Sequence, residues 1–111
     1  MKKYLCIVEV KPEFREEYIN LHKNPWREML EAIRDAGYTK EVIYYYKDQS
    51  IIYLECPDDT THEECDKRLR ATEVCKKWDL TVCPWFSTEK PEPMEKIFDL
   101  NQQLEGELLP D

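Results

Sequence analysis

The 111-residue sequence contains only two glycines, and it lacks both a glycine-rich phosphate loop and a dinucleotide-binding fingerprint. No apolar run approaches the roughly 20 residues that a membrane-spanning helix needs. The 16 basic residues are outnumbered by 24 acidic ones, and this leaves a formal net charge of -8. Nucleic acids and anionic membranes require a basic surface, so neither is expected as a partner. A small neutral or cationic ligand fits this composition better.

The cysteines lack the spacing of a metal site or a disulfide framework. They form an odd set without a CxxC pair, and ligand pairs two to four residues apart are missing, so we expect no metal site. The first apolar run is short, meets charged residues and has no cleavage site, so it reads as a strand rather than a signal peptide. Reduced thiols in a cytoplasmic protein are the simplest interpretation of Cys6, Cys56, Cys65, Cys75 and Cys83.

The first half of the chain alternates between strand and helix patterns. Lys3–Val10 is rich in strand formers, and from Glu13 the apolar residues recur at helical spacing. Asn24-Pro25 predicts a break in this helix, because the residue before a proline is driven away from helical angles. Gly37 is the expected C-terminal cap.

An antiparallel hairpin is expected next, formed by Glu41–Tyr46 and Ile51–Glu55 around a short polar loop. Tyr44 and Tyr46 share one face of the first of these strands and Tyr45 takes the other, although the sequence does not say which face is open. Thr61 followed by Glu64 fits a capping box that begins a second helical region, with a bend near Ala71-Thr72.

The predicted order is completed by a loop over Thr88–Pro93 and a last strand over Met94–Leu100. This order predicts one α+β domain over residues 1–100, a ferredoxin-like split βαββαβ fold with an antiparallel four-stranded sheet and both helices on one face. Residues 101–111 form an acidic tail that is expected to be loosely held. The open aromatic sheet face needs cover from the late segment or from a second copy, and we favour a face-to-face homodimer, a dimeric α/β barrel.

Tyr18, His22 and Trp26 are spaced i, i+4, i+8, so a continuous helix would align them along one side. A phenol, an imidazole and an indole in this arrangement suit either core packing or the wall of a pocket. Histidine is the side chain whose ordinary pKa lies nearest neutrality, so His22 is the best candidate for proton transfer. His62 lies among acidic residues at a helix start and is expected to be a solvated surface residue.

Several stretches carry a resemblance to a known family. They are Glu17-Tyr18 with His22 and Trp26, then Gly37, Ile43-Tyr44, the run Thr72-Glu73-Val74-Cys75-Lys76-Lys77-Trp78, and Lys96–Leu100. With them the chain resembles the L-rhamnose mutarotase family over roughly residues 3–100. This family consists of small dimeric proteins of the ferredoxin-like α/β type. The resemblance implies an isomerase that interconverts the α and β anomers of a reducing monosaccharide without a cofactor.

By this resemblance Tyr18 and His22 would be the acid/base pair, and Trp78 would belong to the sugar-binding wall. Sugars present C–H faces that pack on flat rings, so Trp26 and Tyr44 are further wall candidates. For Trp26 we favour core or interface packing over contact with a ligand.

The chain departs from the family pattern at three positions. Asp79 replaces an aromatic residue beside Trp78, Glu41 replaces a tyrosine that enters the second strand, and Arg27 replaces a proline. We count Asp79 and Glu41 among the substrate-binding candidates, although Asp79 also suits an exposed helix surface. If Asp79 lines the pocket without a donor, its carboxylate favours a sugar hydroxyl where a 6-deoxy sugar carries a methyl group.

Two other functions fit the same architecture. One is a small monooxygenase or haem-degrading enzyme in which His22 and Trp78 supply the key contacts, a reading that rests on fold analogy. The other is a dimeric sugar-binding relative that has lost activity through Asp79 and Glu41.

Overall fold

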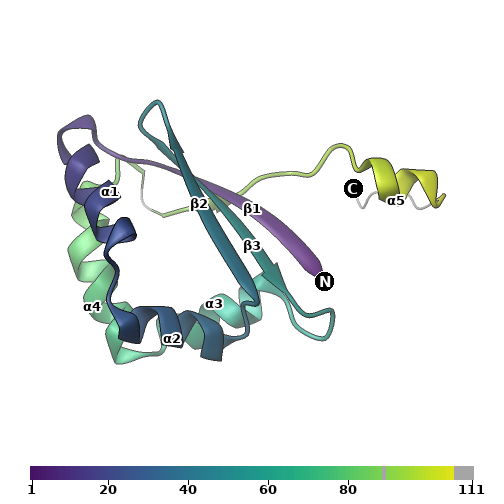
Figure 1. The fold of residues 1–111 in the computed structure, drawn as a ribbon, viewed down its shortest axis with the longest axis horizontal. Coiled ribbons are helices and arrows are strands. Elements are labelled where there is room, and N and C mark those ends of the chain that lie inside the picture. Colours follow the sequence, from purple (N-terminus) through teal and green to yellow (C-terminus); the bar gives the residue numbers. More distant parts are fainter. Residues whose placement is uncertain (89, 107–111) are drawn as a thin grey trace.

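The computed structural model describes residues 1–88 and 90–106. Four strands form one antiparallel sheet in the order β2-β3-β1-β4, and α1 to α4 lie on one side of it (Figure 1). The predicted ferredoxin-like α+β fold is thereby confirmed. The strands are β1 (Lys2–Glu9), β2 (Lys40–Tyr46), β3 (Gln49–Cys56) and β4 (Glu92–Pro93). The helices are α1 (Arg15–Lys23), α2 (Arg27–Ala36), α3 (His62–Arg70), α4 (Glu73–Val82) and α5 (Leu100–Leu104), with 3-10 turns η1 (Pro12–Phe14) and η2 (Cys83–Trp85).

The predicted break at Asn24-Pro25 separates α1 from α2, and Gly37 ends α2 in the left-handed region at φ 119°. A Cβ at Gly37 would lie 2.9 Å from Cys65 Sγ and 2.9 Å from Arg68 Nη2. The glycine therefore permits the positive φ and also leaves the space that α3 needs to approach closely. No helix among the described residues is long and apolar enough to cross a membrane.

The second helical region is divided as expected. The Thr61 hydroxyl accepts a hydrogen bond from the Glu64 amide, so the capping box opens α3. The bend follows Arg70, and Thr72 then caps α4 by accepting from the Cys75 amide. The bend brings the end of α3 close to the middle of α4.

Strand register decides which side chains face the helices. In the hairpin, Tyr45 pairs with Ser50 and Glu41 pairs with Leu54, so these four share the helix-facing side. The turn uses Lys47 and Asp48 with positive φ (49° and 62°), as a two-residue hairpin turn requires. The core contains Cys6, Val8, Met29, Tyr38, Ile52, Leu54, Cys56, Cys65, Leu69, Cys75, Trp78 and Val82.

The predicted last strand is wrong in position. The fourth strand is the two-residue β4, which falls within the predicted loop, and α5 begins at Leu100 inside the predicted strand. β4 pairs with β1 at the sheet edge, where a proline is tolerated because its missing N–H faces away from the ladder. The expected tail is helical up to Leu104, and residues 107–111 lie outside the described part of the chain.

The other face of the sheet carries large apolar side chains in contact with solvent. Tyr44 is 67% exposed, Tyr46 is 61% exposed and Leu5 is 36% exposed. The described late segment does not cover them, because it extends past the sheet and carries α5 away from it (Figure 1). This segment is itself apolar and exposed at Ile97 and Phe98.

Candidate active site

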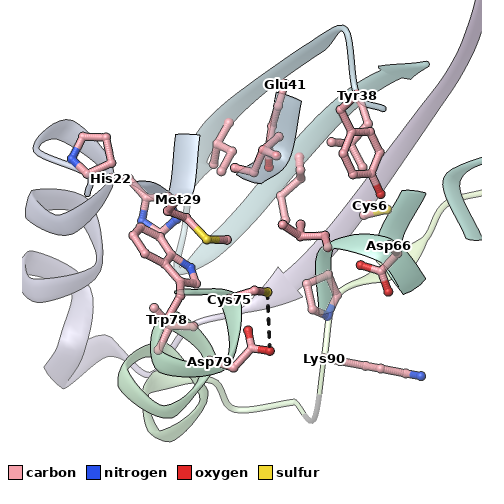
Figure 2. Close-up of a pocket in the computed structure, with 18 of the residues that line it drawn as sticks. Cys6, His22, Met29, Tyr38, Glu41, Asp66, Cys75, Trp78, Asp79 and Lys90 are labelled. Carbon is pink, nitrogen blue, oxygen red and sulfur yellow. Dashed lines mark hydrogen bonds between the residues drawn. The ribbon is translucent and has the colours of Figure 1, made fainter. Parts of the chain in front are cut away.

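A cavity of about 1370 Å³ lies between the helix-facing side of the sheet and the four covering helices. Six of the seven predicted site residues line it, namely Tyr18, His22, Glu41, Tyr44, Trp78 and Asp79. Figure 2 shows His22 and Trp78 on one side of this cavity, with Tyr38 and Asp66 on the opposite side.

Tyr18 is fixed by the sheet beneath it. Its side chain is 3% exposed, and its hydroxyl lies 2.7 Å from Ser50 Oγ of β3, which is fully buried. Burial raises the pKa of Tyr18 to about 12, although the hydrogen bond with Ser50 acts in the opposite direction. The phenol therefore remains protonated at neutral pH and is suited to donate a proton.

His22 is held one helical turn further along α1. Its Nδ1 lies 2.8 Å from the Tyr18 carbonyl oxygen, which only accepts, so Nδ1 carries the hydrogen and Nε2 is the free acceptor. Burial lowers the pKa of His22, and the bond to the Tyr18 carbonyl partly opposes this change. The neutral imidazole is thus favoured, and its Nε2 is suited to act as a base.

Aromatic rings form the wall beside this pair. The Trp78 ring meets His22 edge to face at 5.3 Å and Trp26 at 5.2 Å between ring centroids. Trp26 does not line the cavity but packs against the core behind Trp78, in agreement with the structural role favoured for it.

The predicted wall residue Tyr44 borders the cavity, but strand register directs its side chain to the opposite face of the sheet, where it is 67% exposed. Only its neighbour Tyr45, whose register partner Ser50 is buried, faces the helices, and its ring lies 6.1 Å from that of Tyr18. The tyrosine run could not distinguish these positions, because three equivalent residues in a strand give no clue to the buried face.

Both predicted carboxylates line the cavity, but their surroundings differ. The two Asp79 oxygens each accept from Arg70 Nη1 at 2.6 Å, so Asp79 has a donor. Glu41 lines the cavity, is exposed to solvent by surface area and makes no side-chain hydrogen bond with the described residues. Partial desolvation by the surrounding protein raises the pKa of Glu41 to about 7, against the lowering effect of Arg70.

The expectation for His62 is wrong. The ring is half-buried, its Nδ1 lies 2.6 Å from the Tyr38 hydroxyl, and its Nε2 lies 3.9 Å from Cys6 Sγ. β1 passes the start of α3 and covers the imidazole there, a long-range contact that the local acidic sequence conceals. Burial also raises the pKa of Tyr38.

Ser50 and Arg70 are the other site residues that the sequence did not reveal. Ser50 is one polar residue in an apolar strand, and its burial opposite Tyr18 follows only from register. Arg70 lies nine positions before Asp79, beyond the spacing of a helical pair, and the bend between α3 and α4 joins them. No group of three or more metal-ligating side chains is arranged to hold an ion in the described ranges.

The arrangement combines a base, a proton donor and a flat apolar wall in one water-accessible cavity. Such a set can move protons between two oxygen atoms of a small polar molecule. The pKa values of His22 and Tyr18 are displaced in opposite directions, which separates the two roles at neutral pH.

Comparisons with known proteins place this geometry in a family. The family model for L-rhamnose mutarotase matches residues 3–100. An L-rhamnose mutarotase from Lactiplantibacillus plantarum is 38% identical over 93 residues, which cover 78% of this chain and 86% of that protein. The crystal structure of an L-rhamnose mutarotase from Formosa agariphila superimposes with a TM-score of 0.72 at 15% identity, covering 89% of this chain and 98% of that one.

A solved antibiotic biosynthesis monooxygenase also matches, with a TM-score of 0.60 at 17% identity over 87% of this chain and 99% of that one. At such identity the likeness reports a shared fold and not a shared chemistry. The family-model match, in contrast, covers residues 3–100 and so includes Tyr18, His22 and Trp78. The chain belongs to the L-rhamnose mutarotase family.

Proposed function

We propose that this protein is a cofactor-independent mutarotase that interconverts the α and β anomers of a reducing monosaccharide in the cavity above Tyr18 and His22. The observation that carries the proposal is the fixed His22 imidazole, whose Nδ1–H is bound to the Tyr18 carbonyl and whose Nε2 is left as an acceptor. The five free thiols favour a cytoplasmic location for this activity.

The reaction requires two proton transfers. His22 Nε2 takes the proton of the anomeric hydroxyl, the bond from the anomeric carbon to the ring oxygen breaks, and the Tyr18 hydroxyl gives its proton to that oxygen. The aldehyde turns about its bond to the neighbouring carbon, and the same transfers in reverse close the ring on the other face. A positioned acid or base contributes about 10²–10⁴ in rate.

The surroundings suit these roles. Ser50 can donate to the Tyr18 oxygen, which leaves the phenolic hydrogen free to point at the substrate and stabilises the phenolate that forms. Trp78 presents a flat wall on which the C–H face of a sugar packs.

Anomer exchange measured by NMR saturation transfer tests the proposal, over a panel of hexoses and 6-deoxyhexoses that includes rhamnose. We expect faster exchange for at least one sugar, and we expect His22→Ala to remove most of the gain. A fitting control is His62→Ala, which removes the other imidazole of the cavity wall. Normal exchange by a well-folded His22→Ala variant would contradict the mechanism, and sugar binding without exchange in the parent would indicate a non-catalytic binding protein.

We also propose that two copies pair through the open face of the sheet. A twofold dimer brings the same patch of each copy together, and Tyr44, Tyr46 and Leu5 provide an apolar patch that the described residues leave exposed. The late segment offers a second contact, because Ile97 and Phe98 are 82% and 65% exposed and extend beyond the sheet of their own chain.

Sedimentation equilibrium distinguishes the parts of this proposal. The parent should have twice the mass of one 13.5 kDa chain. Tyr44→Glu with Tyr46→Glu should yield monomers, because two charged pairs would lie in the interface, and Ile97→Ser with Phe98→Ser should weaken the dimer. A parent that remains monomeric at micromolar concentration would refute the pairing.

A further inference from the structure

The cavity extends well beyond the two residues assigned to proton transfer. The Tyr18 hydroxyl marks one end, because it is bound to Ser50 and Ser50 pairs with Tyr45. Glu41 lies on the same face of β2, four residues before Tyr45. At a strand rise of about 3.3 Å per residue, the two rows are separated by about 13 Å.

Polar and charged groups gather at the Glu41 end. Arg70 donates to both oxygens of Asp79 through Nη1 and to Asp66 through Nε at 3.3 Å. Its Nη2 makes no hydrogen bond with the described residues, and the charge of Arg70 acts on Glu41. The cavity lining carries further charged and titratable groups of both signs, among them Cys6, Arg34, Tyr38, Lys40, His62, Glu63, Asp66, Cys75, Lys90 and Glu92.

We propose that Glu41 and the Arg70–Asp79 pair form a polar subsite that binds the sugar hydroxyls lying across the ring from the anomeric carbon. Glu41 accepts from these hydroxyls, Arg70 donates to them, and Asp79 acts as a positioning residue that holds the guanidinium in place. The inference rests on the proposed mutarotase function, because the anomeric carbon must lie at His22.

The separation of the two strand rows agrees in scale with a single sugar. The backbones of the rows lie about 13 Å apart along the sheet, and the side chains and hydrogen bonds of about 2.8 Å that extend from them reduce this span toward the size of one pyranose ring. The group on carbon 6 lies beside the ring oxygen, on the side of the acid/base pair.

The donor and acceptor groups of the subsite restrict the class of sugar. Carboxyl groups of Glu41, Asp66 and Asp79 line the cavity with the Arg70 guanidinium, and Arg34, Lys40 and Lys90 add positive charge to the same lining. Neutral hydroxyl groups satisfy both the carboxyl acceptor and the guanidinium donor. The subsite therefore selects sugars with hydroxyls on carbons 3 and 4 over sugars deoxygenated at these positions.

The earlier expectation about Asp79 changes accordingly. A preference for a 6-hydroxyl required an Asp79 carboxylate without a donor, and Arg70 supplies that donor. We therefore expect Glu41 to discriminate between sugars, through the hydroxyls on carbons 3 and 4, which lie across the ring from the anomeric carbon.

Removing hydroxyls from the sugar and the carboxyl from the protein tests the contact directly. The kcat/KM for anomer exchange is measured by NMR for mannose and its 3-deoxy, 4-deoxy and 6-deoxy forms, the last being rhamnose, in one enantiomeric series. The proteins are the parent, Glu41→Leu and the matched control Glu31→Leu, which places the same change on α2 outside the cavity lining. Circular dichroism checks that each variant is folded.

In the parent, loss of the 3- or 4-hydroxyl should lower kcat/KM by about 10- to 100-fold, the range for a hydrogen bond to a charged group. In Glu41→Leu the same loss should change it by no more than about twofold, whereas Glu31→Leu should follow the parent. Equal losses in the parent and in Glu41→Leu would overturn the subsite. Absence of exchange for every sugar in the parent would instead refute the mutarotase function.

If Glu41→Leu does not fold, Glu41→Gln provides the test through pH. A charged acceptor makes KM in the parent rise as pH falls through neutrality, and the amide should abolish this dependence. An unchanged KM profile in Glu41→Gln would overturn the subsite as well.

Discussion

The hydrogen bond between Tyr18 and Ser50 allows the structural and chemical roles of Tyr18 to be separated. The two hydroxyls lie 2.7 Å apart in the core, and this is the one hydrogen bond that the Ser50 side chain makes with the described residues. Tyr18→Phe leaves the ring packed against Tyr45 and Phe86. It also leaves the Ser50 hydroxyl, which is 0% exposed, without its hydrogen-bond partner.

The expected magnitude follows from this burial. A buried hydroxyl without a partner costs about 1–3 kcal/mol, so Tyr18→Phe should lower the free energy of unfolding by that amount. Ser50→Ala should lower the free energy of unfolding by a similar amount, because it leaves the Tyr18 hydroxyl without its partner instead. The double variant removes both polar groups and should recover most of the stability, since an apolar pair of the same shape is nearly neutral.

Activity should not recover with stability. If Tyr18 donates the proton to the ring oxygen, Tyr18→Phe and the double variant should both lose about 10²–10⁴ in kcat. Ser50→Ala keeps the phenol and should lose far less. Urea unfolding reports the stability, and NMR anomer exchange with saturating sugar reports kcat. Parent-like exchange in the stable double variant would refute the assignment of Tyr18 as a proton donor.

Three further outcomes are expected. Gly37→Ala should destabilise the fold by about 1–3 kcal/mol in urea unfolding, because φ is 119° and the new Cβ would lie 2.9 Å from Cys65 Sγ; Gly106→Ala, at a positive φ with open space around it, is the control. The pKa of Glu41 rises from 4.5 to about 7 on folding, so the free energy of unfolding should fall as pH rises through this window, and Glu41→Gln should remove that slope. The pKa of His22 is lowered from 6.5 on folding, so the acid limb of kcat/KM should lie below pH 6.5, and a limb above it would contradict a neutral imidazole base.

Local signals in the sequence predicted most of the fold. Asn24-Pro25, Gly37 and the Thr61–Glu64 capping box each act within a few residues, and each marks a real boundary. The last strand failed because its signal is not local. Glu92–Pro93 has no strand-forming composition and is a strand only because the edge of β1 offers hydrogen bonds to it, whereas the apolar residues of 94–100 belong to an exposed segment and the start of α5.

The site was predictable in part for the same reason. Tyr18 and His22 lie one helical turn apart, so their neighbourhood follows from helix geometry alone. The partners that set their chemistry come from elsewhere in the chain, as Ser50 does for Tyr18 through strand register. The pairs His62–Tyr38 and Arg70–Asp79 likewise depend on how α3 approaches the sheet and α4, which no local spacing encodes.

The two ends of the cavity have complementary tasks in mutarotation. Ring opening frees the anomeric carbon, and the aldehyde must rotate before the ring closes on the other face. Strong binding of the protein to this carbon would therefore hinder the rotation. A contact across the ring avoids this conflict, because hydroxyls on carbons 3 and 4 keep their place while the aldehyde rotates. If the proposed subsite is correct, retention at Glu41 and freedom at His22 divide these tasks between two strand rows about 13 Å apart along the sheet. The same reasoning predicts that Glu41→Leu raises KM more than it lowers kcat, and an effect confined to kcat would count against it.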